Sequence, residues 1–512
     1  MAQAIITDLD KLGVISDVAS FQTPPNAWSA SRNVSFEDGG VVKSGRKGKV
    51  LINPEKPVNK IYNQQGKLYF TTEDRIWRGN ILVNTDFSKG GSAYLPMPEW
   101  YITELSGVMV FTNEANVPQM ILPGKDKAED LTAWGQEGGA KTWLTPKIRA
   151  YKNFLMAIGM QEQGVDYKKR VRWSDIALPN AAPPSWDATS TTNSAGFNDL
   201  SEAQGDLVDG LPLGDYFMLY TTKEVFLVSY VGGNDIFSFR KVFDNLSILA
   251  PECVAAVKGG HFLVTTSDVV IHNGSSWESI INSRVRKELF YAIGKSRGAR
   301  VKVKYYPAKS EVWILYSASG KEALNRAAVY NTDNNTWTFK DLPDVTAVSY
   351  GVVPSERDRV IDTQHQIIDD DHQLINNLGQ DFIKSSLLVS SENTDWYVMD
   401  EGILGSDYMP CSVTKSNLDF DSWGIEATQH KMVRAIYPQF DGNGTVFISV
   451  GVSESAFDQP KWGEAKAFNI NNDRKVDFRT TGRYISIRFE AFDNNQWSLM
   501  GYSVDVKPRG RK

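Results

Sequence analysis

The residues with the clearest potential for chemistry are a few histidines that stand near carboxylates. His365 is followed by the run 369–371, which is three consecutive aspartates, and then by His372. Such side chains bind divalent ions when they converge on one point. Consecutive side chains diverge in any regular structure, so we interpret this stretch as a solvated charged loop. His261 and His272 flank a predicted strand, where we expect histidines satisfied by hydrogen bonds within the fold.

A second candidate is the segment 331–337, Asn-Thr-Asp-Asn-Asn-Thr-Trp. It is similar to a kelch-type turn before a tryptophan and to the Asp-box turn of sialidases, although Trp337 stands one residue closer to Asp333 than in an Asp-box. Asp and Asn close such a turn by bonding their own backbone, and the Trp caps the core. A glycoside hydrolase would also need two facing carboxylates, or a Tyr nucleophile with an Arg cluster.

Two motifs of nucleophilic and phosphate chemistry are missing from the sequence. It has no Cys–His pair in a catalytic context and no P-loop. Its two cysteines, Cys253 and Cys411, cannot build a disulfide framework, and Cys253 lies in an apolar strand where a buried free thiol is expected. We therefore assign no catalytic, cofactor-binding or metal-binding residue and expect that the protein is not an enzyme and has no cofactor.

The sequence contains three basic segments: 167–172 (YKKRVR), 296–304 (SRGARVKVK) and 506–512 (VKPRGRK). A DNA contact is one interpretation of the first two, but a solvated strand face or a contact with an acidic neighbouring subunit is favoured. The 55 basic and 61 acidic residues give a formal charge of −6, which argues against a broad basic face. For the C-terminal segment we expect docking onto a partner ring.

The elements that would position any site are β-strands. The 512 residues include 14 Trp, 20 Tyr, 24 Phe and 40 Gly, which suits many short strands joined by tight turns. A chain of this length can bury a large core without disulfides or metals. The N-terminal sequence lacks the features of a signal peptide, and no apolar run is long enough to span a membrane. We therefore expect synthesis in a cytoplasm, without a membrane anchor.

A repeated pattern occupies residues 50–356. Apolar runs begin near 67, 108, 153, 216, 261 and 311, and most steps match the spacing of propeller blades. The pattern predicts an all-β fold with a β-propeller of six or seven blades, because stacked blades bury both faces of each sheet. A pair of β-sandwiches is the alternative, since sandwiches are built from similar hairpins.

The other segments surround this repeat. Residues 1–49 are expected to form an extended arm, tied down by a distant strand or a neighbouring subunit. Residues 178–214 are expected to form a long loop within the propeller, and 357–394 an insertion or linker whose part 357–383 is helical or irregular. Residues 395–512 are predicted to form an additional C-terminal antiparallel β-sandwich-like domain, which could also return a strand to close the ring.

Four stretches, taken in order, resemble the tail nozzle proteins (tail tubular protein B-like) of short-tailed bacteriophages and the related tail hub proteins that stabilise packaged DNA. The stretch 23–49 combines an Asn, a strand, a Gly turn and a basic Gly-containing segment. The stretches 170–187 and 205–229 follow, the latter with a Gly-Leu-Pro-Leu-Gly turn before a strand. The stretch 497–512 matches the family's Trp-containing last strand and basic end. Together they cover most of the chain by order.

The resemblance implies a structural virion protein, made in the host cytoplasm and located in the tail. Six copies would form a ring around the DNA exit channel, retain the genome and let it pass during ejection. The implied partners are the tail adaptor ring, tail fibres or spikes, and genomic DNA in transient non-specific contact. No channel-lining residue can be assigned; 187–213 and 357–383 are candidates for tip or docking elements. The alternative is a glycan- or receptor-binding propeller, followed by a glycoside hydrolase.

Overall fold

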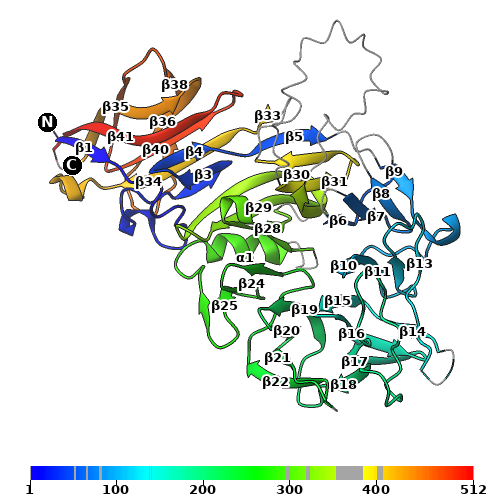
Figure 1. Cartoon of the computed structure of the whole chain (residues 1–512). Coiled ribbons are helices and arrows are strands. Elements are labelled where there is room, and N and C mark those ends of the chain that lie inside the picture. The colour runs from blue at the N-terminus through cyan, green and yellow to red at the C-terminus, as the bar shows by residue number, and fades with distance from the viewer. Residues whose placement is uncertain are drawn as a thin grey trace, which may run out of the picture.

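In the described residues the chain is all-β, with eight antiparallel sheets and one α-helix (Figure 1). The computed structural model describes residues 2–510 except 51–53, 65–66, 80–83, 138, 140, 234, 296–299, 319–322, 353–384 and 401–406. The prediction of an all-β chain is confirmed. The run from His365 to His372 and the segment 357–383 lie outside the described residues. Among the described helices, none combines the length and the apolar character needed to cross a membrane.

Five small sheets follow one another along the first half of the chain. The first contains β6 (Lys60–Gln64), β7 (Lys67–Thr71), β8 (Ile76–Gly79) and β9 (Asn84–Asp86). The second contains β10 (Tyr101–Leu105), β11 (Val108–Thr112), β12 (Gln119–Ile121) and β13 (Glu129–Asp130). The third contains β14 (Trp143–Leu144), β15 (Lys147–Tyr151), β16 (Phe154–Glu162), β17 (Val165–Trp173) and β18 (Gly196–Asp199).

The fourth and fifth sheets repeat the same meander. The fourth contains β19 (Leu207–Leu213), β20 (Tyr216–Thr221), β21 (Val225–Tyr230) and β22 (Phe237–Phe243). The fifth contains β23 (Val254–Val257), β24 (Gly260–Val264), β25 (Val269–His272) and β26 (Trp277–Ser279). The helix α1 (Arg286–Lys295) follows.

The sixth sheet has eight strands and joins distant parts of the chain. Its order is β27 (Lys302–Tyr306), β28 (Glu311–Tyr316), β29 (Leu324–Asn331), β30 (Thr336–Val352), β31 (Ser385–Ser391), β32 (Trp396–Met399), β5 (Arg46–Val50) and β33 (Asp407–Tyr408). The long strand β30 changes partner: its first part pairs with β29, and its last part, from Val345, pairs with β31. β5 comes from the N-terminal segment and pairs with β32.

The first strands of consecutive sheets lie side by side; in the third sheet we count β15 as the first strand and β16 as the second, because the short β14 pairs with the same edge of β16 as β15 does. β6 packs beside β10, and the series continues through β15, β19, β23 and β27. β30 packs beside both β27 and β6, so the series returns to its start (Figure 1). Because side chains of a strand alternate between its two faces, one strand serves two cores. Leu155 of β16 enters the core shared with the second sheet, and Met156 enters the core shared with the fourth.

The apolar runs found in the sequence belong to the second strands of these sheets, which are β7, β11, β16, β20, β24 and β28. The first seven residues of β16 and all of β28 are buried, as expected for strands covered on both faces. Tight turns lead into these strands: Ser106 and Gly107, between β10 and β11, both have positive φ, 51° and 92°. That geometry is the type I′ turn, whose twist matches that of the hairpin.

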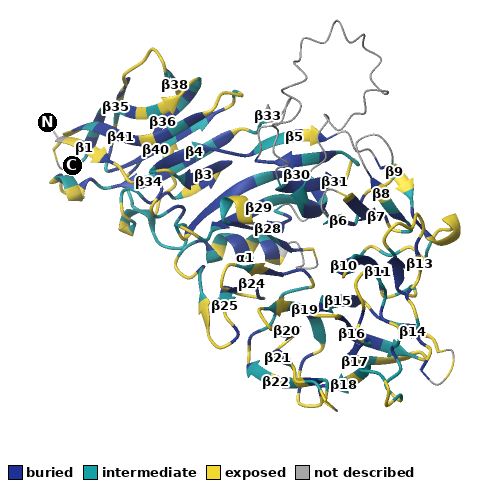
Figure 2. Ribbon diagram, in the orientation of Figure 1, coloured by how far each residue is buried: buried dark blue, intermediate teal, exposed yellow. Residues whose placement is uncertain are grey.

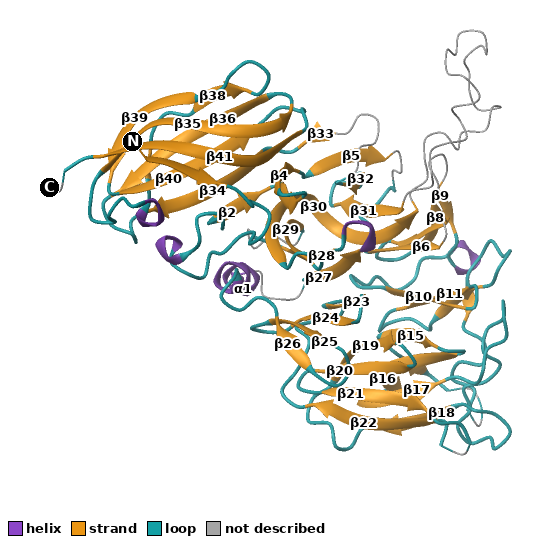
Figure 3. Ribbon diagram, turned by 60° about the vertical axis from the view of Figure 1, so that its left-hand side comes forward, coloured by secondary structure: helices purple, strands orange, loops and turns teal. Residues whose placement is uncertain are grey.

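Two further sheets pack face to face as a sandwich (Figure 3). One has β3 (Val34–Glu37), β4 (Gly40–Lys43), β41 (Trp497–Pro508), β35 (Lys431–Gly442) and β39 (Val476–Gly482), with β1 (Ala2–Ile6) added to β41. The other has β2 (Ala30–Arg32), β34 (Cys411–Leu418), β40 (Tyr484–Ala491), β36 (Thr445–Ser453) and β37 (Lys461–Trp462), with β38 (Lys466–Asn469) added to β36. Figure 2 shows buried residues along the strands of these sheets and exposed residues in the turns around them.

The segment 1–49, expected as an extended arm, supplies β1 to β4 to the sandwich and most of β5 to the sixth sheet. It pairs with distant strands: Ala4 lies opposite Val504, and Val41 opposite Leu499. Between these strands Asp17 accepts hydrogen bonds from the backbone N–H groups of Arg286 and Lys287, both at 2.8 Å. A carboxylate there satisfies unpaired donors at the start of α1.

The stretch 178–214, expected as a loop, contains β18 and β19. The sequence of residues 207–213 predicts a loop, because Gly210 and Pro212 are unfavourable in a strand. β19 is an edge strand of its sheet, and an edge position tolerates Pro because its N–H is not needed.

A buried ion cluster ties the N-terminal segment to the sixth sheet. Lys340 of β30 is fully buried and contacts both the Asp400 carboxylate and the Glu311 carboxylate, the latter at 3.2 and 3.3 Å. Asp400 also accepts the backbone N–H of Gly45 at 2.7 Å. Burial opposes the charge of Lys340, but the two carboxylates outweigh burial and raise the pKa of the ammonium.

Replacing Lys340 by alanine should therefore destabilise the fold strongly. Lys340→Ala leaves two buried carboxylates without their cation, which typically costs about 3–5 kcal/mol. The free energy of unfolding in urea measures the loss. The matched control is Lys49→Ala, which breaks the exposed pair with Asp395 and should change stability little. Equal effects of the two variants would contradict the role given to Lys340.

Candidate functional site

The first strands of the sheets carry charged side chains toward the middle of their ring. Alternation along β15 places Lys147 and Arg149 on one face, and alternation along β27 does the same for Lys302 and Lys304. β6 adds Lys60 at its first position. We call these five cations, with the carboxylates of Asp209 and Glu252, the central cluster.

Asp209 of β19 is the first anchor of the central cluster. It is 0% exposed and accepts two hydrogen bonds from Arg149, both at 2.9 Å, in a fork geometry. The Lys147 ammonium lies 2.9 Å from the same carboxylate, and the backbone N–H groups of Gly210 and Glu252 donate to it at 2.8 and 3.1 Å. Burial would raise the pKa of Asp209, but Arg149 and Lys147 outweigh it and hold that pKa well below its usual range.

Glu252, which precedes β23, is the second anchor. Its carboxylate contacts Lys60 and lies 3.7 Å from Lys302 and 3.9 Å from Lys304. Three lysines thus share one carboxylate, and the contact with Lys60 links β6 to a segment on another part of the ring. Lys302 also donates to the backbone carbonyl of Thr346, at 3.2 Å.

Burial and mutual repulsion act on the lysines of the central cluster. Burial lowers the pKa of Lys304 to about 8, with Arg149 and Lys302 adding to the effect. Burial also lowers the pKa of Lys147 to about 8, against the attraction of Asp209. Burial, together with Lys304 and Lys302, also lowers the pKa of Lys60. The protonated forms of Lys147 and Lys304 are therefore less strongly favoured near neutral pH than those of exposed lysines.

The sequence located only part of this site. Lys302 and Lys304 fall in the basic segment 296–304, but Asp209, Glu252 and Lys60 were not singled out. The available signal was a period-two pattern of polar residues in first strands, such as Lys147 with Arg149. A pattern of this kind does not reveal which distant charges meet.

His261 and His272 meet across two strands of the fifth sheet and share the hydroxyl of Tyr220. The Tyr220 oxygen lies 2.5 Å from His261 Nδ1 and 2.8 Å from His272 Nε2. His272 Nδ1 accepts the N–H of Gly274, and His261 Nε2 faces the carbonyl of Pro212 at 2.8 Å. These partners fix one arrangement: His272 Nε2–H donates to Tyr220, and Tyr220 donates to His261 Nδ1. Both imidazoles are then neutral, and this row of three hydrogen-bonded side chains has a structural role.

The basic segment 167–172 is engaged within the chain. Arg170 forms two 2.7 Å hydrogen bonds to Asp199 and one of 2.8 Å to Glu162. Arg172 is 1% exposed and pairs with Glu137 and Glu162 at 3.3 and 3.2 Å. These two arginines stabilise the third sheet. In the C-terminal segment, residues 506–508 belong to β41, and residues 511–512 lie outside the described part.

The segment 331–337 forms the turn of the β29–β30 hairpin. The Asn331 side chain accepts the backbone N–H of Asp333 at 2.9 Å, and Asn335 has a φ of 58°. Trp337 is buried and donates its indole N–H to the carbonyl of Ile280. The segment thus closes a hairpin and caps a core, as the turn interpretation predicts. Both cysteines are buried and unpaired.

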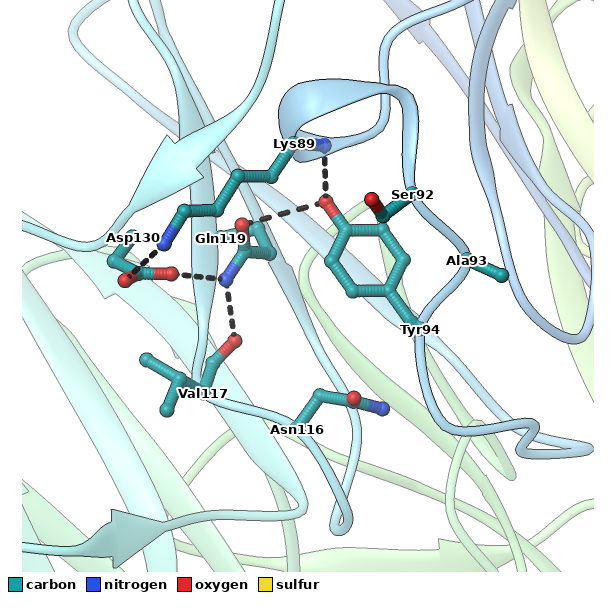
Figure 4. Close-up of a pocket in the computed structure, with 8 residues that line it drawn as sticks. All are labelled: Lys89, Ser92, Ala93, Tyr94, Asn116, Val117, Gln119 and Asp130. Atoms are coloured by element: carbon teal, nitrogen blue, oxygen red, sulfur yellow. Dashed lines mark hydrogen bonds and ion pairs between the residues drawn. The ribbon is translucent and has the colours of Figure 1, made fainter.

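A pocket of about 300 Å³ lies beside the second sheet (Figure 4). The Tyr94 hydroxyl donates to Gln119 at 3.3 Å and accepts the backbone N–H of Lys89 at 2.9 Å. The Gln119 amide donates to Asp130 at 2.8 Å, and Asp130 pairs with Lys89. The lining is one aromatic ring with amides and a single ion pair. Among the described residues, no group of three or more His, Cys, Asp or Glu is arranged to hold a metal.

Asp209→Asn should show how far the third and fourth sheets depend on the central cluster. The change leaves Arg149 and Lys147 buried without their carboxylate, and we expect a loss of about 3–5 kcal/mol in unfolding free energy. Asp215→Asn, at an exposed carboxylate 3.4 Å from Lys152, is the matched control and should stay near wild type. If D209N were as stable as D215N, the cluster would have no structural role.

The histidine chain should make stability depend on pH. Burial and the neighbouring His261 lower the pKa of His272 to about 3, whereas an unfolded histidine titrates near ~6.5. The unfolded state therefore binds the proton first. The free energy of unfolding should fall as pH decreases from about 6.5 toward 3, by up to about 1.4 kcal/mol per unit of pKa shift.

Denaturation curves of wild type and His272→Gln across this pH range isolate that contribution, because carboxylates affect both proteins alike. The stability difference between the two proteins should shrink as the pH falls. Parallel pH profiles would show that His272 does not titrate as the geometry requires.

No family model matches the chain, and no curated protein matches it significantly. One similar solved structure is the computationally designed Ika8 protein, with 8% identity over 69% of this chain and 100% of that chain and a TM-score of 0.38. Another is PorZ, described as an essential bacterial surface component of the type-IX secretion system of Porphyromonas gingivalis, with 9% identity, 85% and 46% coverage and a TM-score of 0.37. Likenesses this weak establish neither a common fold nor a common function.

Proposed function

We propose that the small sheets form a seven-bladed β-propeller. The five sheets from β6 to β26 are five blades, and β27 to the first part of β30 are the sixth. The last part of β30 begins a seventh blade, which continues through β31 and β32 and ends with β5. Two cores support this division. Trp313 and Leu387 share a core between the sixth and seventh blades, and Leu388 and Phe70 share one between the seventh and first.

We further propose that the protein is the tail nozzle subunit of a short-tailed phage, a structural ring that retains the genome and passes it during ejection. The observation that carries this proposal is the order of the four segments that resemble nozzle proteins. The first and last of them, 23–49 and 497–512, are far apart in sequence but pair as β4 and β41 in one sheet. The segment 205–229 spans β19 to β21 of one blade.

A mechanical role is consistent with the charges of the chain. Strong contacts between Lys or Arg and phosphate would hold DNA in a salt-dependent way. The formal charge of −6 favours movement of DNA past the protein over binding of DNA to its surface. The arginines of the segment 167–172, Arg170 and Arg172, are already paired within the subunit, so they do not add free positive charge to a DNA-facing surface.

A glycan-binding propeller is the second candidate, and the pocket in Figure 4 is the observation that favours it. Tyr94 offers an aromatic ring, and Asn116 and Gln119 offer amides, beside the ion pair of Lys89 with Asp130. Such a mixture of one apolar face and a few polar groups suits a sugar ring. The pocket contributes a single carboxylate, whereas glycoside hydrolysis uses a pair, so we do not propose a hydrolase from it.

Solution mass distinguishes the two candidates. Light scattering of the purified chain, alone and with candidate adaptor proteins of the same virion, should give a ring of about six copies if the nozzle proposal holds. A strict monomer that binds no virion protein would contradict it. A glycan array with wild type and Tyr94→Ala would then test the second candidate.

A further inference from the structure

The central cluster holds more cationic side chains than carboxylates. Five cationic side chains, Lys60, Lys147, Arg149, Lys302 and Lys304, lie within 4.0 Å of two described carboxylates, Asp209 and Glu252. Among the other described residues whose charges act on these lysines, Glu99 is negative and Arg300 is positive. Cationic side chains remain in the majority when these two residues are counted.

The two halves of the central cluster are unequally compensated. Asp209 serves two cations and receives two backbone N–H groups, so its half is satisfied. Glu252 serves three lysines, and two of them, Lys302 and Lys304, stand 3.7 and 3.9 Å away, beyond a good hydrogen bond. An ammonium group has three donors, and Lys304 makes the longest of the three lysine contacts with Glu252.

The exposed fractions of these side chains limit the size of any ligand that can reach the central cluster. The side chains of Lys304 and Arg149 are 28% and 14% exposed, whereas those of Lys302, Lys60 and Lys147 are 9%, 7% and 2% exposed. The cluster is therefore open on the side of Lys304 and Arg149 and closed at Lys147. A small anion can approach through that side, but a nucleic acid duplex cannot reach the buried lysines.

We propose that the central cluster binds a small multivalent oxyanion of the phosphate class, held by Lys304, Lys302, Lys60 and Arg149. A tetrahedral anion presents several oxygen acceptors, which can be shared among the ammonium donors and the Arg149 N–H groups that do not bond to Asp209. It also supplies the negative charge that Glu252 alone does not. This ligand differs from DNA in the proposed channel, so the inference does not depend on the nozzle function.

Calorimetry and thermal melting of the full-length chain with inorganic phosphate and pyrophosphate test the proposal, with chloride at matched ionic strength as the reference. Phosphate or pyrophosphate should bind saturably and raise the Tm by a few degrees, because a ligand of the native state stabilises it. Chloride should do neither.

Variants locate the site. Lys304→Gln removes the most exposed cation while Glu252 keeps Lys60 and Lys302, so its melting curve without phosphate should match wild type. Its phosphate affinity should fall about tenfold or more, the size of a charged hydrogen bond. Lys241→Gln is the control and should bind as wild type, because Lys241 lies on β22, is also 28% exposed and pairs with Asp244 outside the cluster. Absent binding, or equal binding by K304Q and K241Q, would overturn the proposal.

Discussion

The pairing of the two chain ends is the interaction on which the rest of the structure depends. β1 and β4, from the first residues, pair along one edge of β41, the last strand. β5 extends the sheet of β30, β31 and β32, whose edge would otherwise be left open to other chains. Without these pairings the last strands of the sixth sheet would lose a neighbour, and β41 would lose its partners along one edge.

Burial of charge is the second constraint, and it acts where distant segments of the chain meet. Within the sixth sheet, Lys340 contacts Asp400, which in turn accepts the backbone N–H of Gly45. Between the third and fourth sheets, Asp209 joins β15 to β19 through Arg149 and Lys147.

Buried ion pairs contribute little net stability compared with apolar packing, and removing one partner is costly. The apolar cores between sheets supply most of the free energy of folding.

Sequence patterns predicted the apolar strands of the fold and missed the strands that carry Gly, Pro and charged residues. Runs such as Phe154–Glu162 are visible because both faces are buried. First strands such as Leu207–Leu213 cannot be recognised in the sequence, since Gly210 and Pro212 suggest a turn. The central cluster could not be predicted for a related reason. Lys60 and Glu252 are far apart along the chain, and only the ring of first strands brings them together. The turn at 331–337 was predictable, because Asn331 bonds to its own neighbours.

Hydrogen exchange with mass spectrometry tests most directly whether strands from the two ends of the chain form one cooperative structure. Peptides covering β4 and β5 should be protected to the same degree as peptides covering β32 and β41, and all four should lose protection at the same denaturant concentration, because paired strands open together. Rapid exchange of the residues of β4 and β5, with β32 and β41 still protected, would contradict the account.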